Sequence, residues 1–256
     1  MSATATDSEI LIQHCSSFDC ITVELLPHST RIIPQELYEV VEQTWSHYLE
    51  ESHRVGRNVW DGLLYRFENC ERQERGLCIR CSTIQAKDAI SFRLIGGRSK
   101  YPQETWAQNM FLGSLVHSSD GFALFGVPSG KTTATRPFDL VGGVLSADEI
   151  QLASGKDLAC LLYNELNEEL NIEEGVVQSV ALLGIVRTRT SSVGLIADCQ
   201  LAVSAAEVRR RFAEKNDGEL REIKTVPLDE LQMCLIQGGG HLPLVWQLKA
   251  ASEGLT

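Results

Sequence analysis

Apolar positions recur along the first hundred residues in two patterns, one typical of strands and one typical of helices. Alternating apolar residues predict a strand at 20–26 and a hairpin whose arms lie at 60–70 and 77–84. A helical repeat follows Pro34, a residue suited to the first turn of a helix. We therefore expect a small α+β unit in this half of the chain.

The second half combines strands with one long helix and several shorter elements. The predicted order is a hairpin, a long helix, two strands, a basic helix that begins at Ser204, a strand and a short helix. These elements lie at 109–116, 122–127, 157–170, 180–187, 193–203, 204 onward, 222–226 and 228–235. Glycine, proline and charged residues at 96–103 place a boundary nearby. The prediction is an N-terminal α+β domain at 1–104 and an α/β domain at 105–256.

Composition narrows the class of protein. The chain has 256 residues, of which 43% are hydrophobic and 22% charged, as in ordinary globular proteins. The net charge of −11 disfavours a nucleic-acid partner, because it repels phosphate backbones. No apolar run approaches the roughly 18 residues of a membrane span, and the first residues are polar. We expect a soluble, cytoplasmic protein with no membrane partner.

The eight cysteines do not form a recognisable metal motif. Cys78 and Cys81 have CxxC spacing, but they lie in a predicted strand, where residues three apart point to opposite faces. No second CxxC and no HxxxH follows. We expect both to be buried thiols that bind no metal, and the reducing compartment disfavours disulfides.

The most informative segment is the predicted helix at 157–170. Glu165, Glu168 and Glu169 share one face of it, beside a stripe of leucines. Three carboxylates on one face repel one another unless a cation lies among them, and Mg²⁺ suits carboxylate and phosphate oxygens. The alternative is a solvated acidic face with no ligand, and the spacing alone does not exclude it.

The residues around this helix resemble the Nudix box. A Gly-Gly pair ending at Gly143 follows a short strand, Glu149 lies six residues later, and 164–172 matches the box in three glutamates and two apolar positions. The match departs at Asn164, where the family has arginine, and at Asn171, where it has glycine. Val141 also replaces a usual proline, and the stretch between Glu149 and Asn164 is seven residues longer than in the family pattern.

The flanking sequence is similar to one animal Nudix subfamily, which hydrolyses UDP-glucose and UDP-galactose. The similar segments are 182–194, Trp60-Asp61-Gly62 and the helix start at 204–209. That subfamily also has an expanded box without the arginine. The resemblance implies a Nudix α/β/α sandwich, with a curved mixed sheet between helices, after a small α+β N-terminal domain.

The resemblance also implies a metal site and a reaction. Mg²⁺, or alternatively Mn²⁺, would lie among Glu165, Glu168, Glu169 and the carbonyl of Gly143. Water would attack a pyrophosphate phosphorus, so that a UDP-sugar yields UMP and a sugar 1-phosphate. Glu165 is one choice of base. Glu219, before the strand at 222–226, is a second, with a solvated loop glutamate as the alternative.

Three further residues are predicted to bind substrate. Arg187 follows the box on a strand and could meet a phosphate, although a surface strand arginine fits the sequence equally well. Phe138 and Asp139 precede the glycine pair and could line a cleft, although an apolar strand end is the simpler interpretation.

Three functions follow, in order of preference. The first is a Mg²⁺-dependent pyrophosphatase for nucleoside diphosphate sugars, with a small nucleotide as its partner. The second is a Nudix hydrolase for another substrate, such as ADP-ribose or a nucleotide cofactor. The third is a catalytically weak module that binds nucleotide sugars. The sequence leaves the base and sugar specificity, the number of metal ions and homodimer formation open.

Overall fold

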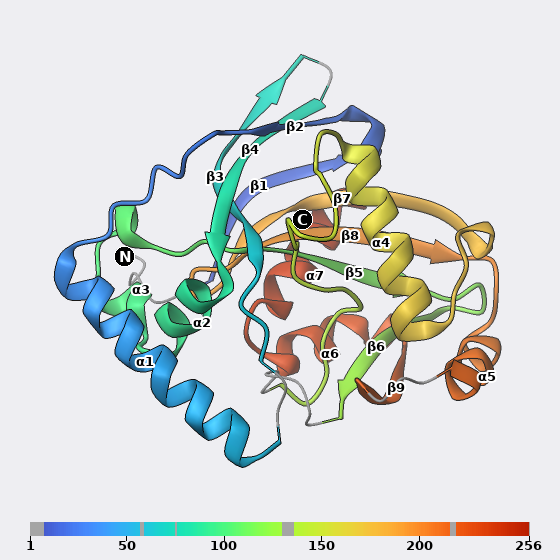
Figure 1. The fold of residues 1–256 in the computed structure, drawn as a ribbon. Coiled ribbons are helices and arrows are strands. Elements are labelled where there is room, and N and C mark those ends of the chain that lie inside the picture. Colours follow the sequence, from blue (N-terminus) through green and yellow to red (C-terminus); the bar gives the residue numbers. More distant parts are fainter. Residues whose placement is uncertain (1–7, 57–58, 75, 130–135, 216–218, 256) are drawn as a thin grey trace.

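The computed structural model describes residues 8–56, 59–74, 76–129, 136–215 and 219–255 (Figure 1). The fold is mixed α/β, with one large sheet, one small sheet and seven α-helices in the described residues. This confirms the expected α/β class.

The large sheet has six strands in the order β1-β7-β8-β5-β6-β9. Its strands are β1 (Glu9–Ser16), β5 (Met110–His117), β6 (Phe122–Pro128), β7 (Val177–Arg187), β8 (Val193–Leu201) and β9 (Leu220–Pro227). β5 and β8 run parallel, whereas the other neighbours are antiparallel. The sheet is therefore mixed, with β1 and β9 at its edges.

The small sheet has three strands, in the order β2-β4-β3. They are β2 (Ile21–Leu25), β3 (Leu63–Gln73) and β4 (Gly76–Gln85). β3 and β4 form the predicted antiparallel hairpin, and β2 adds to β4 in parallel. Cys78 and Cys81 lie in β4 as buried free thiols.

Helices cover both faces of the large sheet. The α-helices are α1 (Gln35–Arg54), α2 (Ala86–Leu94), α3 (Gly97–Lys100), α4 (Gly155–Leu170), α5 (Ala205–Lys215), α6 (Leu231–Gly238) and α7 (Leu242–Ser252). Short 3-10 helices lie at Phe18–Cys20, Gln103–Thr105, Glu174–Val176 and Leu228–Glu230. One hydrophobic cluster joins α4 and α5 to the sheet, and another joins α6 and α7 to it (Figure 1).

The N-terminal region is joined to the large sheet more closely than the sequence suggested. β1 pairs with β7 and so supplies an edge strand of the large sheet. Phe18 and Tyr65 also pack in one cluster with Leu112 and Leu158. The boundary near residue 104 stays a prediction, but residues on its two sides share a core.

In the described part of the chain, no helix is both long enough and apolar enough to cross a membrane.

Candidate functional site

The site begins where two neighbouring strands of the large sheet separate. β5 and β6 pair only at Val116–Leu124 and His117–Ala123, next to their connecting turn. Beyond that point, the segment 139–144 lies between them and bonds to both. It bridges to β6 through Gly126–Asp139, and to β5 through Ser114–Val141 and Phe111–Val144. The segment is thus held at both sides by backbone hydrogen bonds.

Each glycine of the pair in this segment has a separate structural reason. Gly142 has φ +143°, and a Cβ there would lie 2.1 Å from the carbonyl oxygen of Leu112. A Cβ on Gly143 would lie 2.1 Å from Oε1 of Glu165. Any larger residue would therefore displace either the β5 backbone or a carboxylate of α4.

The capping and the apolar stripe of α4 determine where the carboxylate of Glu165 lies. A capping box formed by Ser154 and Asp157 fixes the start of the helix. The stripe of Leu158, Leu162, Leu166 and Leu170 is fully buried, which sets the rotation of the helix.

Two of the three predicted metal ligands then turn toward the glycine segment. Glu165 and Glu169 are half-buried there, and Glu169 accepts a hydrogen bond of 3.0 Å from the backbone N–H of Gly142. Glu168 is exposed on the same helix. The helix and the glycine segment thus bring together Glu165, Glu169 and Gly143, and their role as metal ligands stays a prediction.

Burial and mutual repulsion alter the protonation of both half-buried glutamates. Desolvation, followed by the charges of Glu168, Glu219 and Glu149, raises the pKa of Glu165 to about 7. Desolvation and the charge of Glu165 raise the pKa of Glu169 to about 8, against the opposing effect of the Gly142 N–H. The group has a surplus of negative charge that a cation would relieve.

Glu219 and Glu149 belong to the same electrostatic group. Glu219 comes just before β9 and is exposed, and its charge raises the pKa of both Glu165 and Glu169. Its backbone carbonyl accepts a hydrogen bond from the N–H of Ser129. We call Glu149, Glu165, Glu168, Glu169 and Glu219 the glutamate cluster.

The oxygen atoms of this cluster are suitable ligands for a hard cation, but their side chains are not arranged as a complete metal site. Among the described residues, no group of three or more His, Cys, Asp or Glu side chains is arranged to hold a metal ion. The carbonyl of Gly143 accepts a hydrogen bond of 2.9 Å from the N–H of Leu112, which leaves one lone pair for another partner. Carboxylate and carbonyl oxygens are the ligands that Mg²⁺ and Mn²⁺ prefer.

Asp139, predicted to bind substrate, lies between the glutamate cluster and a basic group. Its charge contributes to the raised pKa of Glu169, and its carboxylate pairs with Arg136. Arg136 also donates a hydrogen bond of 2.7 Å to Nδ1 of His241. His241 is buried, and burial with the charge of Arg136 lowers its pKa to about 3, so the ring is neutral with its proton on Nε2.

Sequence reasoning missed Arg136 and His241. One signal was present, namely the three consecutive glycines before His241. A Cβ on Gly240, which has φ +62°, would lie 2.8 Å from Nη1 of Arg136.

Phe138 is buried rather than open to a cleft. Its ring packs edge-on against Phe125 with centroids 5.2 Å apart, and Nζ of Lys224 lies 3.8 Å from its centroid. The position agrees with the simpler interpretation of this residue, an apolar strand end.

Arg187 has a different environment. Its guanidinium pairs with Glu9 at 2.9 Å, donates to the side-chain oxygen of Gln108, and stacks over Trp106 at 5.5 Å. The guanidinium is thus occupied by partners within the protein. Its assignment to a substrate phosphate stays a prediction.

The two asparagines that depart from the family pattern differ in their surroundings. Asn171 ends α4 in the left-handed conformation, with φ 56° and ψ 42°, which glycine and asparagine tolerate best. Its side-chain amide also donates to the carbonyl of Arg211 at 3.0 Å. Asn164 is exposed on α4. Asparagine therefore suits the left-handed helix end that this position requires.

Comparisons with known proteins add little to this geometry. No family model matches the chain, and no curated protein matches it. The matching solved structures include a crystal structure of DR0079 from Deinococcus radiodurans. It is 18% identical, the match covers 54% of this chain and 82% of that one, and the TM-score is 0.39. A likeness of this size establishes neither a shared fold nor a shared function.

Proposed function

We propose that the protein is a Nudix-type hydrolase that cleaves the pyrophosphate bond of a nucleoside diphosphate sugar with the help of Mg²⁺. In this proposal, the six-stranded sheet and its helices are the Nudix α/β/α sandwich. The glycine segment and α4 are the loop and helix of the Nudix box.

One observation carries the proposal. Glu165 and Glu169, one helical turn apart, lie against the glycine segment: a Cβ on Gly143 would lie 2.1 Å from the carboxylate of Glu165, and Glu169 accepts a hydrogen bond from Gly142. A solvated acidic face would leave both carboxylates in water. Here burial and repulsion hold their pKa values at about 7 and 8, which is unfavourable for the charged form unless a cation binds.

The chain's own residues would divide the work between binding and proton transfer. Glu165, Glu168, Glu169 and the carbonyl of Gly143 would hold Mg²⁺, which when bound neutralises charge on the pyrophosphate oxygens. Glu165 or Glu219 would accept a proton from the attacking water. The water oxygen bonds to phosphorus as the bridging P–O bond breaks, which gives a nucleoside monophosphate and a sugar 1-phosphate.

Asp139 would contribute to substrate recognition from a fixed position. Its backbone exchanges two hydrogen bonds with Gly126, of 2.9 and 3.0 Å, and its carboxylate is held by Arg136. Such a carboxylate can accept hydrogen bonds from ribose or sugar hydroxyl groups.

The direct test is a panel of UDP-sugars, ADP-ribose and nucleotide cofactors, incubated with Mg²⁺ and assayed for released phosphomonoester. We expect release from UDP-glucose or UDP-galactose, none with EDTA, and none from Glu165→Gln. Release from ADP-ribose alone would favour the second Nudix substrate class. No release from any compound would contradict an enzymatic function.

Asn164 is the observation that favours a second candidate, a module that binds nucleotide sugars without efficient turnover. It stands where the family has an arginine, is exposed, and supplies no positive charge to the cluster. Calorimetric binding of UDP-glucose by a protein that releases no phosphomonoester would support this candidate.

A further inference from the structure

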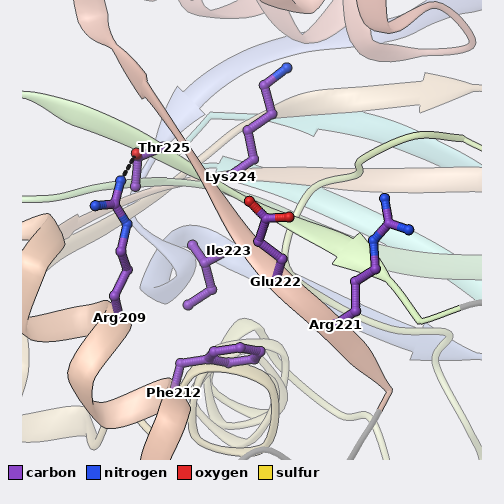
Figure 2. Close-up of a pocket in the computed structure, with 7 residues that line it drawn as sticks. All are labelled: Arg209, Phe212, Arg221, Glu222, Ile223, Lys224 and Thr225. Atoms are coloured by element: carbon purple, nitrogen blue, oxygen red, sulfur yellow. Dashed lines mark hydrogen bonds between the residues drawn. The ribbon is translucent and has the colours of Figure 1, made fainter.

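A basic groove runs along the outer edge of the large sheet, on β9. It is a hollow of about 420 Å³ lined by residues 221–225 of the strand and by Arg209 and Phe212 of α5. Figure 2 shows the side chains of Thr225 and Ile223 on the side of β9 that faces Arg209 and Phe212, and those of Arg221, Glu222 and Lys224 on the other side. The edge strand thus has an apolar surface on the side of α5 and two cations on its other side.

Arg209 differs from the two arginines that follow it on α5 in its ion pairs. On α5, Arg210 pairs with Glu207 and Glu214, and Arg211 pairs with Glu207. Arg209 instead reaches across to the hydroxyl of Thr225, as the dashed line in Figure 2 shows, although its charge also lowers the pKa of Asp120. The groove therefore includes an arginine that no carboxylate binds directly in the described chain.

The other two cations of the groove are on β9 itself. In the part of the chain that the structure describes, neither Arg221 nor Lys224 forms an ion pair. Lys224 lies over the ring of Phe138. With Arg209 they make three cations beside one carboxylate, Glu222, in a chain whose net charge is −11.

The backbone of β9 is also available for pairing. Within the described ranges of the chain, β9 is an edge strand that pairs with β6 alone, so alternate backbone groups point outward. Pro128 pairs with Leu220 and Val127 with Glu222, so Arg221 is the extra residue of a β-bulge. A bulge re-aims the side chain of its extra residue, here at one end of the groove.

We propose that this groove binds an acidic, extended segment of a partner protein, which adds to the edge of β9. The side chains of Arg221 and Lys224 lie on one side of β9, and those of Ile223 and Phe212 lie on the other. Side chains of a paired strand alternate between its two sides. A strand of alternating acidic and apolar residues would place its acidic groups beside Arg221 and Lys224, while its apolar side chains cover Ile223 and Phe212. Strand addition and charge complementarity would act together.

A second copy of this chain is a poorer occupant. Two β9 strands paired edge to edge would bring Arg221 and Lys224 of each copy near the cations of the other, and like charges disfavour such pairing. A compact phosphate ligand is also a poorer fit, because small-ligand sites are usually enclosed, whereas this hollow follows five consecutive residues of an exposed edge.

The test uses a fluorescent peptide of alternating glutamate and valine, with the same peptide carrying prolines and a lysine-valine peptide as comparisons. Fluorescence polarisation at low salt should show binding of the glutamate peptide alone, weakening as salt rises. The triple variant Arg209→Gln, Arg221→Gln, Lys224→Gln should weaken binding at least tenfold. Arg210→Gln, on the same helix but paired to glutamates, should leave it unchanged.

Four results would overturn the proposal. These are no binding of the glutamate peptide, equal binding of the proline peptide, equal loss in Arg210→Gln, and retention of binding by the triple variant. Inorganic tripolyphosphate that binds in place of the peptide would instead assign a phosphate site. A dimer in sedimentation that the triple variant abolishes would assign the edge to a second copy. Thermal unfolding of each variant checks that the fold is kept.

Discussion

Two clusters of charged residues, both partly buried, balance their charges in opposite ways. In the clamp formed by Glu9, Arg98, Arg187 and Trp106, both guanidinium groups lie 2.9 Å from one oxygen of Glu9. They also stack on the indole of Trp106, at 4.9 and 5.5 Å. In the glutamate cluster, by contrast, carboxylates face carboxylates and raise one another's pKa.

The difference separates a structural role from the proposed functional one. The clamp satisfies its charges internally and ties β1 to β7 and to α3, so its natural contribution is stability. In the proposed function, a cation from outside the chain balances the charges of Glu165 and Glu169. Like charges that remain together in a fold lower its stability, and a bound cation is the simplest reason to keep them.

The largest expected effect is on activity at the cluster. Glu169→Gln keeps the size of the side chain but removes one charge from the proposed metal site. We expect turnover of a confirmed substrate to fall about 10²-fold or more, as for other preorganised electrostatic groups. The fall in turnover is measured by steady-state hydrolysis at several Mg²⁺ concentrations. Glu174→Gln, at an exposed position just beyond α4, is the control and should leave turnover unchanged. Near-normal hydrolysis by Glu169→Gln would mean that the cluster is only an acidic helix face.

The clamp should show the opposite behaviour. Glu9→Gln leaves two buried guanidinium groups without their carboxylate, and we expect a loss of about 2 kcal/mol in the free energy of unfolding. That is below the 3–5 kcal/mol of a fully buried pair, because the side chain of Glu9 is 47% exposed. Denaturant unfolding measures the loss, while kcat should stay the same. Glu51→Gln, which breaks an exposed pair with Arg54, is the control and should cost less than about 1 kcal/mol.

The pH dependence of stability should distinguish the cluster further. The folded pKa values of Glu165 and Glu169, about 7 and 8, lie above the unfolded value of about 4.3. Between these limits the folded protein binds more protons than the unfolded one. The cluster's contribution to metal-free stability should therefore be lost as the pH rises from about 5 to 8.

Mg²⁺ should reverse that loss, because it takes the place of the protons. Its stabilising effect on the melting temperature should be larger at about pH 8 than at about pH 6, by a few degrees. The double variant Glu165→Gln, Glu169→Gln should lose most of this difference. Equal Mg²⁺ effects at both pH values in the wild-type protein would count against a cation site.

The smallest effect concerns the end of α4. Asn171→Ala should destabilise the protein by about 1–2 kcal/mol, because alanine resists the left-handed conformation and loses the bond to Arg211. Asn171→Gly should cost less, since glycine adopts that conformation freely. Thermal melts of the two variants decide the order. A cost that is the same for both would assign the role of Asn171 to its side-chain hydrogen bond.

The sequence predicted the elements with strong periodicity, and it missed those whose position depends on tertiary contacts. The hairpin of β3 and β4, and α4 with its buried leucine stripe, were predicted from local pattern. β1 was missed, because it is defined by pairing with β7, far along the chain. α7 was also missed, since its apolar residues are distributed around the helix and no clear polar face marks it.

The same limit applies to the site. Glu165 and Glu169 could be predicted because helical spacing alone places them on one face. Glu219 was assigned to the site only through the family resemblance, because it lies far from α4 along the chain. The pairing of Asp139 with Arg136 was not predicted, because no local pattern marks it. Arg187 shows the converse: its residue type suited a phosphate, but the sequence carried no sign of Glu9, 178 residues away.

The most direct test of the cation site is a crystal structure with millimolar Mg²⁺ or Mn²⁺. The account predicts a divalent ion within about 2.0–2.6 Å of carboxylate oxygens from Glu165 and Glu169. Anomalous scattering from Mn²⁺ would identify it, and the Glu169→Gln crystal is the matched comparison. No ion at these carboxylates, at a metal concentration that saturates any effect on melting temperature, would contradict the assignment and with it the proposed hydrolase.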